Sequence, residues 1–309
     1  MAEIVTLTMN PALDVTTSVP QVEPVHKLRC APPRRDPGGG GINVARVVRA
    51  LGGDAIALFP AGGPTGAAVS ALLAGAGVPA LPVPIAGTTR ESFTVDETGS
   101  GDQFRFILPG PQIAPAELDA VIAALEGIGG PPRWIVVSGS MPPGVEAAAL
   151  YRRIAAIAAR TGARLVIDSS GPALAACEGV RPFLIKPSYS ELGALAGRDV
   201  SEEAAQVEAA RELLARGFAQ MVLVSLAERG ALLVSEAGAE RFAAIPVKAV
   251  SGVGAGDSMI AAMVLMLSRG AEPAEAVRWG LAAGAAALLA PGTQLARRED
   301  IERLRAALG

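Results

Sequence analysis

The chain has 309 residues, of which 50% are hydrophobic and 18% are charged, a composition that excludes an intrinsically disordered protein. Its 27 lysines and arginines against 30 aspartates and glutamates give a net charge of −3, so no global basic field exists to hold nucleic acid or anionic lipid. Two cysteines and one histidine exclude zinc clusters and Ser-His triads, and they fit a protein of the reducing cytoplasm.

Short apolar runs bounded by turn residues alternate with amphipathic, helix-like stretches along most of the chain. The runs and stretches in chain order are residues 4–9, 42–51, 55–62, 67–77, 134–139, 150–162, 164–171, 183–188, 202–217, 221–226 and 231–236. Continuous Val, Ile and Leu strands separated by helices are typical of a parallel sheet buried on both faces. The sequence therefore predicts an α/β protein with a doubly wound, mainly parallel sheet and helices on both faces.

Two segments, residues 15–35 and 89–108, depart from this pattern because apolar and polar side chains alternate along them. A period of two residues predicts half-buried strands, and the Gly-Ser-Gly sequence at 99–101 predicts a hairpin turn. We expect these segments to form a small antiparallel sheet, a lid that projects from the core. The core then comprises residues 1–14, 36–88 and 109–309.

The lid sheet is too small to be stable alone, so its alternate apolar side chains need cover. We expect a homodimer in which two lids pack face to face. The apolar side chains in question are Val15, Val19, Val22, Val25, Leu28, Phe93, Val95, Phe104 and Phe106.

No membrane-spanning segment and no membrane partner are expected. The first residues carry Glu3 and no basic region, unlike a signal peptide, and the uncharged segment between Ser70 and Arg90 is interrupted by three prolines.

The densest glycine signal is residues 37–41, Pro-Gly-Gly-Gly-Gly, which run into an amphipathic stretch containing Asn43. Glycines let the backbone approach a ligand closely, and the free N–H groups of a helix N-terminus attract polar and anionic groups. We expect Gly39, Gly40 and Asn43 to contact a polar ligand. The alternative is a flexible linker, although linkers rarely open directly into a periodic helix.

A second glycine-rich segment, residues 251–258, opens another helix-like stretch. Its alternating glycines predict a nest of N–H groups suited to phosphate oxygens, and Asp257 at the edge could accept a proton from a hydroxyl. The spacing matches neither a P-loop, which needs Lys-Ser/Thr after its last glycine, nor a dinucleotide fingerprint in a first βα turn. The layout indicates phosphoryl transfer; the alternative is that Asp257 only caps the helix.

Polar clusters follow several predicted strands, at the ends where open parallel sheets bind ligands. Among them we single out Lys186 as a cation for phosphate and Glu191 as a carboxylate for metal-bound water, although each cluster taken alone is an ordinary loop. The clusters are Ser138 to Gly144, with Ser140 at its centre, Asp168 to Gly171, Lys186 to Glu191, and Ser225 to Ala227.

The lid also carries a cluster of cations, of which we single out Lys27, Arg29, Arg90 and Arg105, and Asp14 lies just before it. Arginine pairs bidentately with phosphate and carboxylate, so this group indicates an anionic substrate. The alternative is that they are isolated surface charges.

Together these motifs resemble the ribokinase-like, PfkB-type carbohydrate kinases, and among them the 6-phosphofructokinase branch. They occur in the family's order across nearly the whole chain, and the segment Val253 to Ser258 is highly specific for the family. The segments 27–30 and 37–46 are similar to those of the sugar-phosphate branch.

The resemblance implies that Asp257 is the general base and that the backbone of Gly254, Ala255 and Gly256 forms an anion hole. It implies a sugar site and an ATP site on either side of this centre. The sugar site would comprise Asp14, Gly39, Gly40, Asn43 and Ser140, with Arg90, Arg105, Lys27 and Arg29 on the sugar's phosphate, the last two reaching the partner's site across the dimer. The ATP site would comprise Lys186, Ser188, Ser225, Ala227 and the loop from Val253 to Gly256.

Magnesium in this family is organised by an Asn-x-x-Glu motif, which here reads Ser188-Tyr189-Ser190-Glu191, so Glu191 would act through water. Ala227 stands where a glycine is usual, and Gln294 where close relatives carry arginine. The region of Gln294 borders the family's monovalent-cation site, which makes potassium a candidate cofactor beside ATP and magnesium.

The resemblance implies that the reaction is the ATP-dependent phosphorylation of fructose 6-phosphate to fructose 1,6-bisphosphate. The alternatives are a tagatose-6-phosphate or fructose-1-phosphate kinase of the same family, a non-catalytic sugar-phosphate sensor and, more distantly, a Rossmann-type oxidoreductase. Product analysis with each sugar phosphate is expected to separate the kinases of the first group. ATP turnover measured with and without sugar distinguishes a kinase from a non-catalytic sensor.

Overall fold

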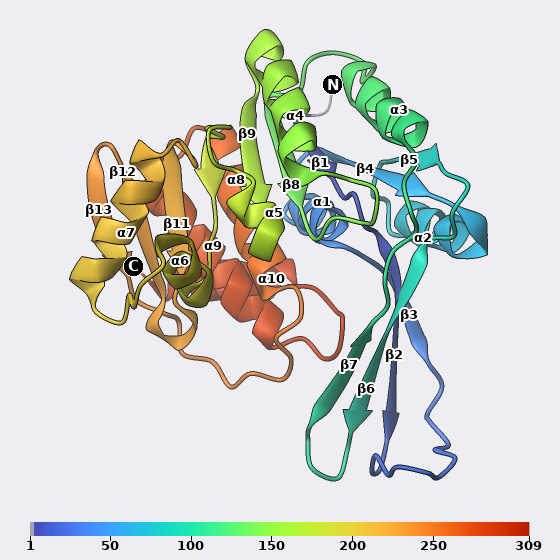
Figure 1. Cartoon of the computed structure of the whole chain (residues 1–309). Helices are drawn as coiled ribbons and strands as arrows, with labels where there is room; N and C mark the ends of the chain where they lie inside the picture. The colour runs from blue at the N-terminus through green and yellow to red at the C-terminus, as the bar shows by residue number, and fades with distance from the viewer. Residues whose placement is uncertain (1–2, 309) are drawn as a thin grey trace.

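The computed structural model describes residues 3–308 and has two sheets, a nine-stranded one in the body and a four-stranded one in a projecting lid (Figure 1). The strands of the body are β1 (Ile4–Leu7), β4 (Ala55–Ala61), β5 (Ala80–Pro84), β8 (Trp134–Ser138), β9 (Arg164–Asp168), β10 (Leu184–Ile185), β11 (Met221–Ser225), β12 (Ala231–Ser235) and β13 (Gly238–Phe242). They lie in the order β13-β12-β11-β10-β9-β8-β1-β4-β5. All neighbours from β5 to β11 are parallel, and β12 and β13 add two antiparallel pairings at one edge.

Helices cover both faces of the nine-stranded sheet, as predicted (Figure 1). One face packs on α1 (Gly40–Ala50), α2 (Gly63–Gly75), α8 (Ala255–Ser268), α9 (Pro273–Leu288) and α10 (Arg298–Ala306). The other packs on α3 (Pro115–Glu126), α4 (Ala147–Thr161), α5 (Gly171–Ala175), α6 (Tyr189–Ala196) and α7 (Glu203–Ala215). Successive strand residues alternate between the two cores: Ile4 joins the first, Val5 the second. This alternation buries both faces of the sheet and explains the continuous apolar runs.

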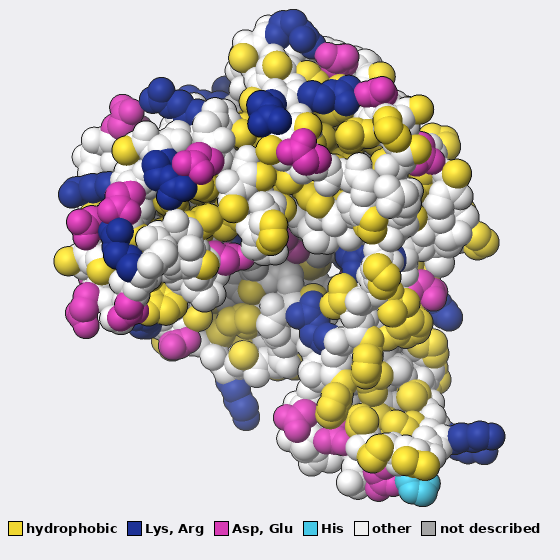
Figure 2. Space-filling model, in the orientation of Figure 1, with side chains coloured by type: hydrophobic (Ala, Val, Ile, Leu, Met, Phe, Trp, Pro, Cys, Tyr) yellow, Lys and Arg dark blue, Asp and Glu magenta, His cyan; other side chains and the backbone are white. Residues whose placement is uncertain are grey.

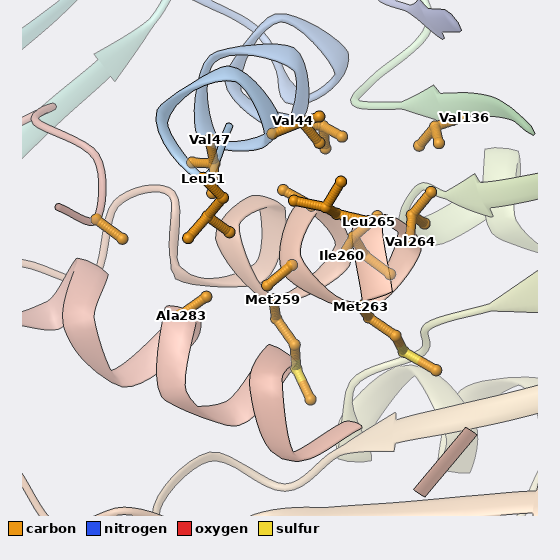
Figure 3. Packing of buried hydrophobic residues seen from close by; sticks show 14 of the residues in the cluster. Val44, Val47, Leu51, Val136, Met259, Ile260, Met263, Val264, Leu265 and Ala283 are labelled. Carbon is orange, nitrogen blue, oxygen red and sulfur yellow. The ribbon is translucent and has the colours of Figure 1, made fainter. Parts of the chain in front are cut away.

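Helix α8 is the most deeply buried helix-forming segment, since every residue from Ser258 to Ser268 is buried. A helix that is apolar all round must have neighbours on all sides. Figure 3 shows Ile260 and Leu265 directed toward Val44 and Val47 of α1, and the neighbouring helix α9 contributes Ala283. The N-terminus of α8 is therefore held in a fixed position by packing.

The lid consists of β2 (Ala12–Val19), β3 (Arg34–Gly38), β6 (Arg90–Glu97) and β7 (Gln103–Ile107), in the order β3-β2-β6-β7. The prediction of an antiparallel sheet is wrong at one pair, because β2 and β6 are parallel. Both lid segments leave the body on their first strand and return on their second, so the two outward strands pair at the centre and the return strands lie at the edges. The hairpin turn at 99–101 is confirmed between β6 and β7.

Two other features of the lid differ from the sequence prediction. Residues 20–33 are a loop instead of a strand, and the strands at the lid's base extend to Ala12 and Gly38. Val15 and Val19 are already buried within the chain. Fewer apolar side chains of the lid therefore need cover than the sequence indicated.

The register of the lid gives it a polar and an apolar face. Asp14, Asp36 and Ser92 are cross-strand partners on one face, and Val15 and Phe93 are partners on the other. Phe93 pairs with Phe106 and Val95 with Phe104, so the four predicted apolar residues do share the second face. Figure 2 shows hydrophobic side chains gathered on the lid below the body. Those exposed by more than a third of their surface in the two lid hairpins are Val25, Leu28, Phe93, Phe104, Phe106, Ile107 and Leu108.

Several elements carried no clear sequence signal: β5, α3, α5, α6, β13, α9 and α10 were not anticipated, and the run 183–188 yields only the two-residue strand β10. Among the described helices, none combines the length and apolarity needed to cross a membrane.

Candidate active site

The predicted site residues of the body converge at the carboxyl ends of the parallel strands. The strand order changes direction at β1, whose neighbours are β8 and β4, and open α/β sheets bind ligands at such a point. A cavity of about 260 Å³ lies there, beside the N-terminus of α8. Its lining is Ser138, Gly139, Ser140, Asp168, Ser169, Ser170, Lys186, Glu191, Gly254, Gly256 and Asp257.

Asp257 lies in the first turn of α8 and is held by two hydrogen bonds. Asn43 Nδ2, from α1, donates to Asp257 Oδ2 at 2.9 Å, and Ser138 Oγ, from the end of β8, donates to Oδ1 at 3.4 Å. These contacts join three segments that are far apart in sequence. Asn43, expected to contact a ligand, thus also orients the carboxylate.

The environment of Asp257 makes its carboxyl group more basic than usual. Burial raises its pKa from 3.8 to about 6, and the neighbouring carboxylate of Asp168 adds to the increase. The hydrogen bond from Asn43 and the charge of Lys186 act in the opposite direction. A base of this pKa is mostly ionised at neutral pH and can still accept a proton efficiently.

Lys186 follows β10 and forms a buried ion pair with Asp168, at the end of β9, with 3.2 Å between Nζ and Oδ1. Burial by itself lowers the pKa of a lysine, but the carboxylates of Asp168, Asp257 and Glu191 together outweigh it, and the pKa of Lys186 is raised. The lysine is therefore a permanent cation. A Cβ at Gly256 would lie 3.2 Å from Lys186 Nζ, so this cation lies directly against the glycine nest.

The glycine nest forms the beginning of α8. Gly254 is its N-cap with φ of 73°, a left-handed conformation that a side chain would strain, and Ala255 and Gly256 form the first turn. The first backbone N–H groups of a helix have no partner within the helix and carry its positive dipole end. Asp257 and the predicted anion hole therefore occupy one helix terminus, adjacent to the ammonium of Lys186.

The first glycine run is a packed turn instead of a linker. Gly39 is the N-cap of α1, and a Cβ at Gly40 would lie 2.3 Å from Ser138 Oγ, so only glycine fits there. Ile42 N donates to Thr8 Oγ1 at 2.7 Å. The run therefore brings backbone close to the carboxyl end of β8, next to Asp257.

The lid presents charged side chains at its base. Burial raises the pKa of Asp14, on β2, to about 6; Arg90 lowers it and Asp36, directly opposite on β3, raises it, while Arg105 and Arg46 act as Arg90 does. Arg90 donates to the backbone oxygens of Leu108 and Asn10 at 3.2 Å each. Arg105 is exposed on β7.

Ser140 connects the body to the segment that enters the lid. It accepts a hydrogen bond from Asn10 Nδ2 at 3.0 Å, and the backbone oxygen of Asn10 accepts from Arg90. Asn10 therefore links a predicted sugar-site residue of the body to one of the lid.

Ser188 and Glu191 form a capping box at the start of α6. The backbone N–H of Ser188 donates to Glu191 Oε2 at 2.8 Å, and Glu191 N donates back to Ser188 Oγ at 3.3 Å. Ser188 Oγ also donates to Glu191 Oε2, at 2.7 Å. Glu191 also lines the cavity, whereas Ser188 turns its hydroxyl to the carboxylate.

Carboxylates and hydroxyls of the cavity fit a magnesium ion, which prefers oxygen ligands and usually retains several waters. Within residues 3–308, no three Asp, Glu, His or Cys side chains gather closely enough to hold a metal ion by themselves. Asp168 and Glu191 would therefore share an ion with nucleotide phosphates and water.

Lys27, Arg29, Ser225 and Ala227 are among the predicted site residues that do not line the cavity. Lys27 and Arg29 are exposed on the loop that joins β2 to β3, and the single histidine, His26, marks the lid's tip in Figure 2. Ser225 pairs with Ser188 at the end of β11, and Ala227 begins the 3₁₀ helix η1 (Ala227–Arg229). Ala227 has φ of 51°, the left-handed region, which is the physical reason a glycine suits this position.

Sequence reasoning did not select three residues that the structure brings to the site. Ser138 and Asp168 belong to polar clusters that the sequence places at strand ends. The structure shows that Ser138 donates a hydrogen bond to Asp257 and that the charge of Asp168 raises the pKa of Asp257. Asp36 gave no signal, because its position opposite Asp14 depends on the lid's register.

The fold and site together define an α/β enzyme equipped for phosphoryl transfer: a buried carboxylate of raised pKa, a helix N-terminus for anionic oxygens and a cation beside it. The family model described as pfkB family carbohydrate kinase matches residues 2–300. The chain therefore belongs to this family of carbohydrate kinases.

Known relatives cover almost the full chain. The chain is 52% identical over 301 residues to the ATP-dependent 6-phosphofructokinase isozyme 2 of Mycobacterium tuberculosis strain H37Rv, and the match covers 97% of this chain and 88% of that protein. It is 35% identical over 304 residues to the 1-phosphofructokinase of Rhodobacter capsulatus, covering 97% and 95%. The crystal structure of Escherichia coli phosphofructokinase-2 in complex with potassium matches with a TM-score of 0.94 at 41% identity, covering 100% and 99%.

Proposed function

We propose that this protein catalyses the ATP-dependent phosphorylation of fructose 6-phosphate to fructose 1,6-bisphosphate. The family assignment and the relative named 6-phosphofructokinase support this acceptor. The single observation that carries the chemistry is the buried carboxylate of Asp257, of raised pKa, at the N-terminus of α8.

In the proposed reaction, Asp257 accepts the proton of the acceptor hydroxyl while its oxygen forms a bond to the γ-phosphorus of ATP. The bond between that phosphorus and the β,γ-bridging oxygen breaks, and ADP leaves. Backbone N–H groups from Gly254 to Asp257 and the ammonium of Lys186 stabilise the equatorial oxygens as charge moves onto them. Asn43 and Ser138 keep the carboxylate oriented.

The proposed sugar site lies between the body and the lid. Asp14, Gly39, Gly40, Asn43 and Ser140 would contact the sugar hydroxyls, and Arg90 and Arg105 would hold the existing phosphate. Arg90 is anchored by two backbone oxygens, so its guanidinium is already oriented. A fixed guanidinium loses little entropy when it binds an anion.

The proposed nucleotide site lies on the other side of Asp257. Lys186 would contact the β- and γ-phosphates, and Ser188, Ser225, Ala227 and Val253 would border the rest of the nucleotide. Magnesium, when bound, would offset the charge of the phosphates, with Asp168 and Glu191 as its protein-side oxygens. Potassium is a further candidate, supported by the relative whose structure is named as a potassium complex.

The proposed oligomer is a homodimer through the apolar face of the lid. Phe93, Phe104 and Phe106 stay more than a third exposed in the single chain, whereas the opposite face carries the polar side chains of the site. In this arrangement Lys27 and Arg29 would approach the partner's sugar phosphate, which gives these two exposed cations a role. The division into a core and a dimerising lid is part of the same proposal, as is a cytoplasmic location.

A second acceptor, fructose 1-phosphate, is favoured by the Rhodobacter relative. Phosphorylation of either fructose monophosphate yields the same bisphosphate, so product identity alone does not separate them. The decisive assay measures kcat/KM for fructose 6-phosphate, fructose 1-phosphate and tagatose 6-phosphate with ATP and magnesium. The proposal requires fructose 6-phosphate to be preferred by at least about tenfold. Preference for another acceptor would contradict the proposed substrate. If no sugar phosphate changed the rate of ATP turnover, the proposal that the protein is a sugar-phosphate kinase would be wrong.

A further inference from the structure

Thr293, in the loop between α9 and α10, has its hydroxyl in a buried polar cluster at the base of the lid. The residue is 5% exposed. Its Oγ1 donates to Asp36 Oδ2 at 2.7 Å and accepts from Arg34 NH2 at 3.0 Å, both on β3. It also lies 3.2 Å from Thr16 Oγ1 on β2; because its single hydrogen is directed at Asp36, Thr16 is the donor there.

The same loop contacts the segment that leads to the anion hole. The backbone oxygen of Gly292 accepts a hydrogen bond from Ser251 Oγ at 2.9 Å. Ser251 Oγ in turn accepts from the backbone N–H of Val253 at 3.3 Å, one residue before Gly254. Ser251 is also buried, so these hydrogen bonds are shielded from water.

The Asp36 that Thr293 contacts lies directly opposite Asp14 of the proposed sugar site. Its carboxylate is neutralised by Arg34 at 2.7 Å and, less closely, by Arg46 at 3.8 Å. Thr293 supplies the remaining close donor. Without that hydroxyl, Asp36 loses its attachment to the loop that supports Val253.

We propose that Thr293 is a positioning residue that couples the sugar side of the active site, on the lid, to the anion hole at the start of α8. Binding of the sugar phosphate fixes the strands β2 and β3, and the connection from Asp36 through Thr293, Gly292 and Ser251 transmits that position to Val253. This inference rests on the proposed function, because it assumes that the lid strands and the N-terminus of α8 serve the two substrates of one reaction.

The test compares Thr293→Val, which removes the hydroxyl at nearly the same shape, with Thr293→Ser, which keeps it. For each variant, kcat and both KM values are measured well below its melting temperature, with the active fraction determined independently. A lost hydrogen bond to a charged group predicts that Thr293→Val raises the KM for the sugar phosphate roughly ten- to a hundredfold. The KM for ATP measured at saturating sugar should change less, and Thr293→Ser should stay close to the unmodified protein.

Ser251→Ala, alone and combined with Thr293→Val, tests transmission through the loop. Ser251→Ala should act mainly on kcat, and the effects of the two substitutions on kcat/KM should be clearly less than additive. The inference would be overturned if the two effects were additive. It would also be overturned if Thr293→Val left the sugar KM unchanged and lowered only the active fraction, or if it changed only the potassium requirement. If the unmodified protein prefers another sugar phosphate, the proposed acceptor fails, and the same comparison is made with the acceptor that it does use.

Discussion

The pH dependence of the reaction follows directly from the burial of two carboxylates. Burial raises the pKa of Asp257 and of Asp14 to about 6 in each case. Asp257 must be ionised to accept a proton, and Asp14 is expected to accept hydrogen bonds from the sugar. Activity should therefore be present above pH 6 and decline as the pH falls through that value.

The size of the decline distinguishes this environment from an ordinary one. At pH 5, a carboxyl group of pKa about 6 is ionised in roughly one molecule in ten, whereas one of ordinary pKa remains more than about nine-tenths ionised. If both carboxylates are required, kcat/KM for the sugar phosphate should fall to about a hundredth of its plateau. If only Asp257 is required, it should fall to about a tenth.

The assay is a pH profile of kcat/KM with the Asp168→Asn variant beside the unmodified protein. The substrate's own phosphate also titrates near pH 6, but its pKa does not depend on the protein. Removing the Asp168 carboxylate takes away a charge that raises the pKa of Asp257, so the acid limb should move to lower pH. An activity that stays flat to pH 5, or an acid limb that does not move in Asp168→Asn, would refute this account of Asp257.

Three substitutions test the surrounding sites. Arg90→Ala should raise the KM for fructose 6-phosphate roughly ten- to a hundredfold and that for ATP much less, because a charge-assisted contact to the sugar's phosphate is lost. Ser188→Asn should lower the magnesium concentration needed for half-maximal rate, since an amide reaches further than a hydroxyl that is directed at Glu191. Phe104→Glu should weaken the dimer at least about tenfold, measured by sedimentation, and reduce activity in parallel, because it places a charge in an apolar interface.

Each of these substitutions also has a result that contradicts its premise. A change confined to the KM for ATP would place Arg90 in the other substrate's site. An identical magnesium titration would show that position 188 has no influence on the metal. A fully active monomer at assay concentration would contradict the proposal that the lid forms a dimer. It would also contradict the proposed role of Lys27 and Arg29 in the partner's site.

The sheet of the body could be predicted because burial on both faces leaves a direct record in sequence, as continuous apolar runs such as 134–139 and 221–226. The alanine-rich helix α9 left no such record, since small side chains mark no clear polar face. The parallel pairing of β2 with β6 also could not be predicted, because alternation shows that a strand has two faces and says nothing of its partner.

The catalytic centre was predictable where its chemistry is local in sequence. Gly254, Gly256 and Asp257 lie within four residues, so the nest and the carboxylate were visible together. The influence of Asp168 and Asn43 on the pKa of Asp257 could not be predicted from the sequence, because Asp168 lies 89 residues earlier in the chain and Asn43 lies 214 residues earlier. Their effect arises only when parallel strands bring their carboxyl ends to one edge of the sheet.

The most direct test of the central claim is the turnover of Asp257→Asn with ATP, magnesium and fructose 6-phosphate. Asparagine can still accept the hydrogen bond from Asn43, and it removes a buried charge, so the melting temperature should be unchanged or higher. Both substrates should bind with nearly unaltered affinity, while kcat falls roughly 10² to 10⁴-fold, as expected for the loss of a positioned base. A folded Asp257→Asn variant that turns over at close to the normal rate would contradict the claim that this carboxylate accepts the proton in the transfer.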